Sequence, residues 1–158
     1  MDEDAPQGQA GFTEALKQLL PVARQRVAIL SPELPASSYG DADVVELIKQ
    51  FLLSNDRSQL RVLVESPDRT MKQAHRLVEL GRQVSSRVEF RQLTDEQRGI
   101  DEELVIADEA AWMQRAPKLN LQTSLYLQAS LNARLQLRRY DELWDRAVPA
   151  RDFYVLGI

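Results

Sequence analysis

Residues 101–108 read DEELVIAD, a short apolar run with acidic residues on both sides. The stretch EAAWMQ follows after a predicted turn, so this part of the sequence predicts a β-hairpin. Asp101 and Glu103 occupy alternate positions that lead into the first strand of the hairpin. Two interpretations are open. In the first, the acids lie at the solvated start of an ordinary strand. In the second, they occupy positions of a catalytic motif whose catalytic residues have been replaced.

Upstream of the hairpin, helix and strand patterns alternate. Apolar residues at helical spacing predict helices, and short apolar runs ended by turn residues predict strands. One predicted helix starts at a cap on Thr13 and is interrupted at Pro21, and two more helices span 41–55 and 68–86. The predicted strands span 26–32, 59–67 and 87–93. Strands that alternate with helices of this length need crossover connections, which indicates a largely parallel sheet.

Downstream of the hairpin the pattern changes. Residues 121–129 predict a further strand, and Asn132 is placed to cap a closing helix that ends near residue 147. A hairpin pairs its strands antiparallel, so the sequence predicts an α/β fold with a mixed sheet of about five to seven strands and helices on both faces. We expect residues 1–11 to form a disordered leader and residues 12–158 to form a single domain.

The composition is that of a globular protein. The 158 residues are 28% charged, with a formal net charge of −4 that argues against general attraction to nucleic acid but leaves a local basic patch open. The chain has no cysteine, which excludes disulfides and favours a reducing, cytoplasmic location. It has no apolar run long enough to span a bilayer, no phosphate-binding glycine motif and no metal-ligand spacing, so we expect no membrane contact, cofactor or metal.

Several stretches, in their order along the chain, resemble a known family. They are RVAILSPEL at 26–34, LRVLVES at 60–66, RVEFRQL at 87–93 and YDELWDRA at 140–147. Together with the hairpin they resemble a single-repeat phospholipase D-like domain over residues 12–147, of the kind found in small bacterial endonucleases. The chain is also similar to bacterial domains of unknown function that share this fold. The resemblance implies a phospholipase D-like topology.

The catalytic motif of that family is a histidine, a lysine two residues later and an aspartate five residues after the lysine. In this register Asp101 stands at the histidine position, Glu103 at the lysine position and Asp108 at the aspartate position. The Gly-Ser-x-Asn that often follows in the family corresponds to residues 115–118, which read RAPK. Only the aspartate of the motif is kept.

The replacements matter because the resemblance implies a mechanism with a nucleophilic histidine and cationic lysines around the phosphate. At about 4 Å and an effective dielectric constant near 20, a phosphate repels an acid by roughly 4 kcal/mol, whereas it attracts a lysine. The sequence therefore predicts a non-catalytic domain without catalytic residues. Such a domain would serve as a binding, scaffold or regulatory module, with another protein as one possible partner.

Two alternatives stay open. In the first, Asp101, Glu103 and Asp108 act as acid, base or metal-binding carboxylates of a metal-dependent hydrolase. In the second, the basic helix at 69–76 binds phosphate or nucleic acid near its N-terminus. Its anion-binding candidates are Arg69, Thr70, Lys72, His75 and Arg76. The ordinary interpretation of this helix is a solvated basic face beside the only histidine of the chain.

The resemblance also implies a homodimer, because a single-repeat member of the family builds its two-fold arrangement from two chains. Facing motif strands would bring the three motif acids against their symmetry mates, where like charges are unfavourable. Arg115 or Lys118 of the second chain could compensate them, or the chains could stay apart or pair elsewhere. The apolar run LNLQTSLYLQASL at 119–131 favours a homodimer that covers this surface.

Overall fold

One sheet organises the fold. The computed structural model describes residues 8–73, 75–116 and 122–153, without the side chains of 8–10, 71–73 and 75. Within these residues seven strands form a single sheet in the order β6-β5-β4-β1-β2-β3-β7. The strands are β1 (Arg26–Leu30), β2 (Gln59–Val64), β3 (Val88–Gln92), β4 (Glu103–Ala107), β5 (Ala111–Arg115), β6 (Ser124–Tyr126) and β7 (Val148–Pro149). The helices are α1 (Gly8–Leu19), α2 (Ala36–Tyr39), α3 (Ala42–Leu53), α4 (Pro67–Gln73), α5 (His75–Gln83) and α6 (Ser130–Arg146), with 3-10 turns η1 (Leu20–Val22), η2 (Asp95–Gln97) and η3 (Arg151–Phe153).

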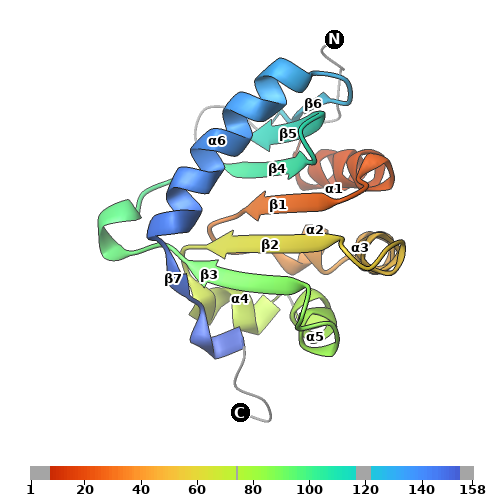
Figure 1. The fold of residues 1–158 in the computed structure, drawn as a ribbon. Coiled ribbons are helices and arrows are strands. Elements are labelled where there is room, and N and C mark those ends of the chain that lie inside the picture. The colour runs from red at the N-terminus through yellow and green to blue at the C-terminus, as the bar shows by residue number, and fades with distance from the viewer. Residues whose placement is uncertain (1–7, 74, 117–121, 154–158) are drawn as a thin grey trace.

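The sheet is mixed. β1, β2 and β3 run parallel, whereas β4 pairs antiparallel with β1 and is followed by the antiparallel strands β5 and β6. β7 adds a short antiparallel edge beside β3. Figure 1 shows α6 crossing one face of the sheet, while α1, α3 and α5 lie on the other. The predicted α/β fold, with a mixed sheet and helices on both faces, is confirmed.

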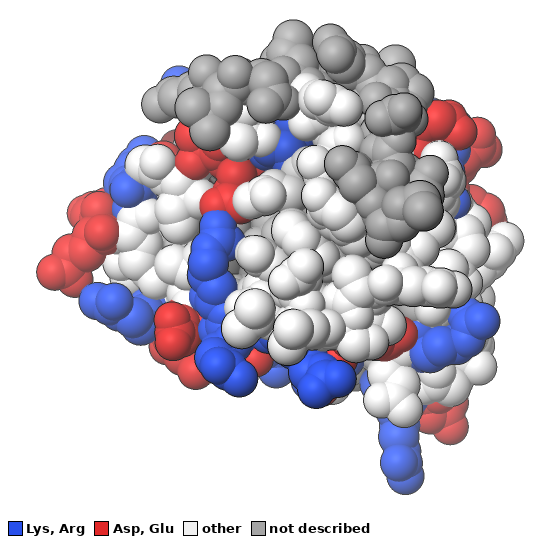
Figure 2. Space-filling model, turned by 90° about the horizontal axis from the view of Figure 1, so that it is seen from above, with Lys and Arg blue, Asp and Glu red and all other residues white. Residues whose placement is uncertain are grey.

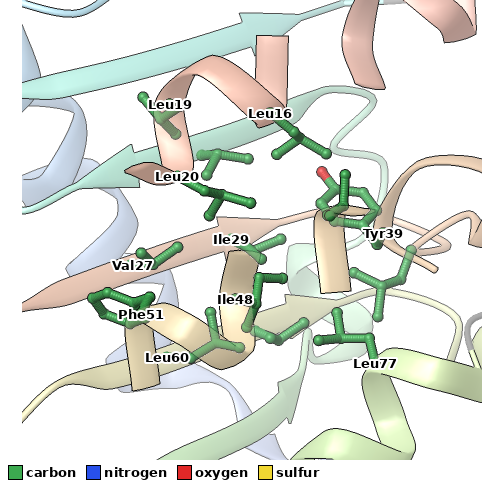
Figure 3. Close-up of a cluster of buried hydrophobic side chains, with 14 of the residues drawn as sticks. Leu16, Leu19, Leu20, Val27, Ile29, Tyr39, Ile48, Phe51, Leu60 and Leu77 are labelled. Carbon is green, nitrogen blue, oxygen red and sulfur yellow. The ribbon is translucent and has the colours of Figure 1, made fainter. Parts of the chain in front are cut away.

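The larger core fills the space between the sheet and the helices α1, α3 and α5. Figure 3 shows its side chains converging from helices and strands, and none of those labelled is more than 4% exposed: Leu16, Leu19, Leu20, Val27, Ile29, Tyr39, Ile48, Phe51, Leu60 and Leu77. Burying a side chain of this size contributes about 1.5–3 kcal/mol. This cluster therefore supplies much of the free energy that holds the helices on the sheet.

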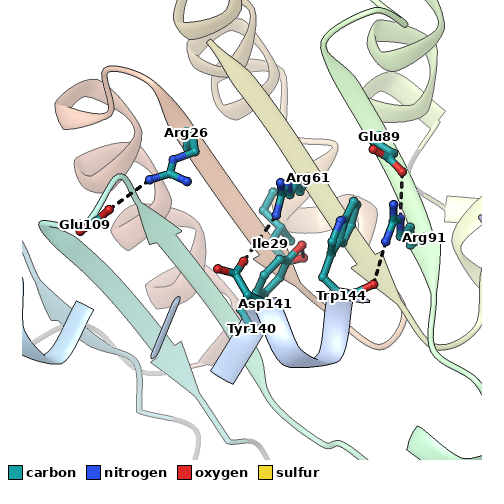
Figure 4. Close-up of polar contacts among 9 residues, drawn as sticks. All are labelled: Arg26, Ile29, Arg61, Glu89, Arg91, Glu109, Tyr140, Asp141 and Trp144. Carbon is teal, nitrogen blue, oxygen red and sulfur yellow. Dashed lines mark hydrogen bonds and ion pairs between the residues drawn. The ribbon is translucent and has the colours of Figure 1, made fainter. Parts of the chain in front are cut away.

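A smaller core lies under α6. The Tyr140 hydroxyl donates a hydrogen bond of 3.1 Å to the carbonyl oxygen of Ile29, which satisfies the one polar atom that this ring buries (Figure 4). The Trp144 ring lies between the guanidinium groups of Arg61 and Arg91, which are 5.2 and 4.4 Å from its centroid. Because a cation is attracted to the face of an aromatic ring, these contacts hold α6 against β2 and β3.

The first helix differs from the prediction at its start. α1 begins at Gly8 rather than after Thr13, so residues 8–11 of the expected leader are helical, and residues 1–7 lie outside the described part of the chain. Thr13 is buried within α1, where its hydroxyl and that of Ser38 form a hydrogen bond of 2.8 Å. The predicted cap was wrong because this side chain finds its partner in another helix, which local capping rules do not consider.

Three other local predictions can be compared with the structure. Pro21 lies in the 3-10 turn that ends the first helix, as predicted. Asn132 does not cap the closing helix, because α6 already begins at Ser130. Of the strand predicted over 121–129, the extended strand β6 covers only Ser124–Tyr126, and residue 121 lies outside the described part of the chain.

Gly81 of α5 generates a prediction about packing. A Cβ atom added there would stand 2.6 Å from Cε2 of Phe90, whose ring is 1% exposed. We expect Gly81→Ala to destabilise the fold by about 1–2 kcal/mol, because overpacking outweighs the roughly 1 kcal/mol that alanine gains over glycine in a helix. Urea unfolding followed by circular dichroism measures the change. Gln83→Ala, at an exposed position of the same helix, is the control, and a Gly81→Ala protein as stable as the wild type would contradict the expectation.

Candidate functional site

The motif strand β4 lies in the middle of the sheet, and its two ends face opposite ends of the molecule. Because β4 runs antiparallel to β1, Glu103 lies near the carboxyl end of β1, and the last residue of β4 lies near the start of β1. Asp101 therefore belongs to the end of the sheet where the parallel strands finish, and Asp108 belongs to the other end. The five residues of β4 extend over about 17 Å, so the three motif acids do not form one group.

Asp108 ties the hairpin turn to the start of β1. Its Oδ1 accepts hydrogen bonds from the backbone N–H groups of Gln25 and Arg26 at 2.8 and 2.9 Å. Its Oδ2 accepts one from the N–H group of Arg24 at 2.9 Å. The φ angle of Asp108 is +55°, a left-handed conformation that aspartate adopts more readily than most residues. The one motif residue that the sequence keeps therefore has a structural role.

Glu103 is buried, with 6% of its surface exposed. Its Oε1 accepts a hydrogen bond of 2.8 Å from the Tyr39 hydroxyl, and the Ser31 side chain is a second hydrogen-bonding neighbour. Arg115 is the cross-strand neighbour of Glu103 on β5; it is also buried, with its guanidinium 5.2 Å from the centroid of the Phe12 ring. An acid at the lysine position thus lies inside the protein rather than in an open site.

Burial dominates the electrostatics of this carboxyl group. Desolvation raises the pKa of Glu103 from 4.5 to about 7, although hydrogen bonds from Ser31 and Tyr39 and the charge of Arg115 lower it. The charge of Asp101 adds a smaller increase. Burial also raises the pKa of the Tyr39 hydroxyl well above 10, and the Glu103 charge raises it further. Tyr39 therefore remains a neutral donor, and Glu103 titrates near neutral pH.

Asp101 lines an open cleft of about 600 Å³ at the carboxyl ends of β1, β2 and β3. Such strand ends are where α/β proteins commonly bind ligands. The charged residues of the lining are five acids and two arginines, namely Glu33, Glu65, Asp68, Asp101, Asp152, Arg69 and Arg98. Both arginines lie beside acids of the same lining, Arg69 at 2.7 Å from Glu33 and Arg98 at 3.8 Å from Glu65. The cleft is therefore acidic.

Two of the predicted anion-binding residues, Arg69 and Thr70, are engaged in contacts within the chain. Thr70 is fully buried, and its hydroxyl lies 2.9 Å from the carbonyl oxygen of Glu33 and 3.1 Å from that of Ser66. Arg69 is exposed, but its guanidinium is paired with the Glu33 carboxylate. Thr70 is thus a structural residue that joins α4 to the loop after β1.

The remaining candidates of the basic helix are divided between two helices. The single helix predicted over 68–86 consists of α4 and α5, with residue 74 outside the description. Arg76 donates a hydrogen bond of 3.4 Å to the carbonyl oxygen of Gly40. The side chains of Lys72 and His75 lie outside the described residues, so the complete basic stripe is not described.

Tyr39 and Arg115 were not predicted from the sequence as neighbours of Glu103. Tyr39 lies 64 residues before Glu103, in a stretch that shows no strong periodicity. A usable signal existed for Arg115, because a hairpin around residues 108–110 pairs it with Glu103.

Among the described residues, no three acidic or histidine side chains gather to hold a metal ion, and no helix has the length and apolar character to cross a membrane.

Known structures share this fold, and one of them is described as a phospholipase D family member. NucT from Helicobacter pylori is similar with a TM-score of 0.63 at 12% identity, over 94% of this chain and 97% of that one. Nuc from Salmonella typhimurium, a phospholipase D family member, has a TM-score of 0.59 at 8% identity, over 85% and 87% of the two chains. TrmBL2, an archaeal chromatin protein with a novel mode of DNA binding, has a TM-score of 0.64 at 17% identity, over 94% of this chain and 55% of its own.

The chain belongs to the family described as Domain of unknown function (DUF7931), whose model matches residues 8–156. It spans about half the length of TrmBL2. No curated protein sequence matches it. The phospholipase D-like fold that the sequence resemblance implies is confirmed, and the matching family is a domain of unknown function.

Glu103 generates a prediction about pH. Its carboxyl group is protonated more readily in the folded protein than in the unfolded chain, so the wild type loses stability as the pH rises from 4.5 through about 7. We expect Glu103→Gln, which stays neutral, to be more stable than the wild type by about 3 kcal/mol at pH 8 and to differ little at pH 4.5. Urea unfolding across this pH range measures the difference. Glu96→Gln, at an exposed position, is the control, and a difference that does not grow with pH would count against the buried carboxyl.

Asp108 generates a second prediction. Asp108→Ala removes the acceptor of three backbone N–H groups, so we expect a loss of about 1–2 kcal/mol in unfolding free energy. Asp108→Asn keeps one oxygen acceptor and should lose less. Glu109→Gln alters the next residue, whose ion pairs are exposed, and should change stability by under about 1 kcal/mol. Equal stability of the alanine variant and the wild type would show that water replaces the carboxylate without cost.

Proposed function

We propose that this domain is a non-catalytic phospholipase D-like module that binds a partner or ligand and does not cleave phosphodiesters. The observation that supports this most directly is the sign of the charge at the motif strand. Glu103 stands where the family's mechanism needs a lysine, and it is buried beneath Tyr39. A carboxyl group at that position repels a phosphoryl oxygen when ionised and gives it no cation when neutral.

The surroundings of the motif strand support the same proposal. The adjoining cleft contains more acids than arginines, and each arginine already has an acidic neighbour. The only histidine of the chain, His75, begins α5 and does not belong to the motif strand. Neither the nucleophile nor the cations of the family's mechanism are therefore present on β4.

A metal-dependent hydrolase built from the three motif acids has less support. Asp108 lies at the opposite end of β4 from Asp101 and Glu103. Its two oxygens already accept hydrogen bonds from three backbone N–H groups. Moving Asp108 toward the other acids would break these hydrogen bonds, which join the hairpin turn to the start of β1.

Nucleic acid is the second candidate ligand, on the observation that TrmBL2 shares the fold and is described as a DNA-binding chromatin protein. Arg69, whose side chain is 67% exposed at the rim of the cleft, is the described residue of the basic helix best placed for a phosphate. A cytoplasmic, bacterial setting is part of the proposal and rests on the lack of cysteine and on the family resemblance.

Phosphodiesterase assays test the leading proposal. The protein is incubated with bis(p-nitrophenyl) phosphate, single-stranded DNA and phosphatidylcholine vesicles, each with EDTA and with Mg²⁺, Ca²⁺ or Zn²⁺. We expect no product above that of an Asp101→Ala variant. Turnover that is lost in Asp101→Ala but kept in Asp152→Ala, another acid of the cleft, would contradict a non-catalytic domain.

Fluorescence anisotropy with labelled oligonucleotides tests the second candidate. Binding that weakens with salt and with Arg69→Ala and Lys72→Ala would support nucleic acid as the ligand, because phosphate contacts release counterions. Arg57→Ala, an exposed arginine of the loop before β2, is the matched control. No binding at low salt would remove this candidate.

A further inference from the structure

A second hollow lies between η1 and the end of α3, and we call it the η1–α3 pocket. Its volume is about 390 Å³. It lies at the end of the sheet opposite the acidic cleft, because η1 precedes the start of β1 and the end of α3 precedes the start of β2. Figure 3 shows two of its lining residues, Leu20 and Phe51, near Val27 at the start of β1.

Apolar residues form most of the lining of this pocket. Pro21 has no N–H group and lies where α1 ends, so the chain continues as the 3-10 turn η1 before it enters β1. Leu20, Ala23 and Phe51 are buried lining residues, and Pro21 and Leu47 are more accessible. The polar residues of the lining are Arg24, Gln50 and Ser54. A hollow of this volume, with mostly apolar walls and few polar groups, is typical of sites for small molecules.

Arg24 is the only ionisable residue of this lining. Its Nη1 donates hydrogen bonds of 3.0 and 3.3 Å to the carbonyl oxygens of Pro21 and Ala23, which hold the guanidinium group at the pocket. These bonds also close the turn η1, a structural role that uses one of three guanidinium nitrogens. Within the described part of the chain this guanidinium forms no ion pair, because the carboxylate of Asp108 contacts the backbone N–H group of Arg24 instead. Its charge is therefore available to an anion.

Other cations of the sheet are compensated within the chain. Arg26, Arg61 and Arg91 lie 3.2, 3.4 and 2.8 Å from carboxylates. Figure 2 shows basic and acidic side chains next to one another on the face seen from above. The acidic cleft is the reverse case, because its acids outnumber its arginines. A fixed cation beside apolar walls therefore distinguishes the η1–α3 pocket in a chain whose net charge is −4.

We propose that the η1–α3 pocket binds a small organic carboxylate with an apolar body. The carboxylate accepts hydrogen bonds from the guanidinium group of Arg24, and hydrogen bonds between two charged groups are stronger than those between neutral ones. The apolar body lies against Pro21, Leu47 and Phe51 and is removed from water. An inorganic anion would leave these walls uncovered, and a neutral hydrocarbon would leave the cation without a counter-ion. The site uses no residue of the motif strand, so it does not depend on whether the domain cleaves phosphodiesters.

NMR titrations of the labelled protein with hexanoate test this proposal. We expect hexanoate to shift the amide signals of residues 20–24 and 47–54 and to bind about tenfold more tightly than hexan-1-ol or hexylammonium, because only the carboxylate pairs with a guanidinium group. Hexan-1-ol that binds as tightly as hexanoate would show that the cation contributes nothing and would overturn the proposal. Inorganic phosphate that binds as tightly would overturn it as well, because the apolar walls would then contribute nothing.

Variants of Arg24 test the charged contact. Arg24→Gln should weaken hexanoate binding about tenfold without changing that of hexan-1-ol, and Arg24→Lys should keep part of the affinity because it keeps the charge. Arg57→Gln removes another exposed arginine at this end of the sheet, outside the pocket lining, and should change the affinity less than about twofold because solvent and salt screen its charge. A folded Arg24→Gln protein that binds hexanoate as the wild type does contradicts the proposed site.

A change in the pocket wall tests the same site without altering η1. Gln50 is exposed on α3, so Gln50→Glu should leave the fold intact and place an acid beside the bound carboxylate. We expect this variant to lose hexanoate binding, because like charges repel at short distance. Gln83→Glu adds the same acid at an exposed position of α5 outside the pocket and is the control. Equal hexanoate binding by the two variants would overturn the proposal, even if Arg24→Gln failed to fold.

Discussion

The antiparallel pairing of β4 with β1 is the contact on which the rest of this structure depends. Both strands are central, and every residue of β4 is buried. The pairing joins the parallel strands to the hairpin strands and decides which end of β4 lies beside which end of β1. Asp108 fixes that relation at one end by accepting three backbone hydrogen bonds from the segment that enters β1. Since backbone donors need partners, this carboxylate holds the register as well as the turn.

The other end of β4 carries the buried carboxyl group of Glu103, whose charged form destabilises the folded protein. The pKa of Glu103 rises to about 7 because desolvation outweighs two hydrogen bonds and the charge of Arg115. The mechanism implied by the phospholipase D-like resemblance needs a permanent positive charge at the same place. A buried carboxyl that titrates near neutral pH cannot supply it, and the acidic cleft outside adds further negative charge. These features support the proposal of a non-catalytic domain.

The two faces of α6 differ in their contacts. Its inner face is held by the Tyr140 hydroxyl on Ile29 and by Trp144 between two arginines of the sheet. Figure 4 shows how these contacts, with the pair of Arg61 and Asp141, occupy the helix side that meets the sheet. Its outer face keeps exposed leucines that the domain does not cover. A single helix crosses this side of the seven-stranded sheet, so its outer face remains at the surface of the domain.

The sequence by itself determined the fold class and the position of the motif strand. Apolar periodicity is a local property, so the alternation of helices and strands, the hairpin after residue 101 and the interruption at Pro21 could be predicted. Only the tertiary structure decided what the motif residues do. The antiparallel direction of β4 placed Glu103 beside the end of β1 and Asp108 beside its start, and Tyr39 reached Glu103 across 64 residues of chain. Burial, which sets the pKa of Glu103, depends on layers packed from distant segments, and no local pattern contains that information.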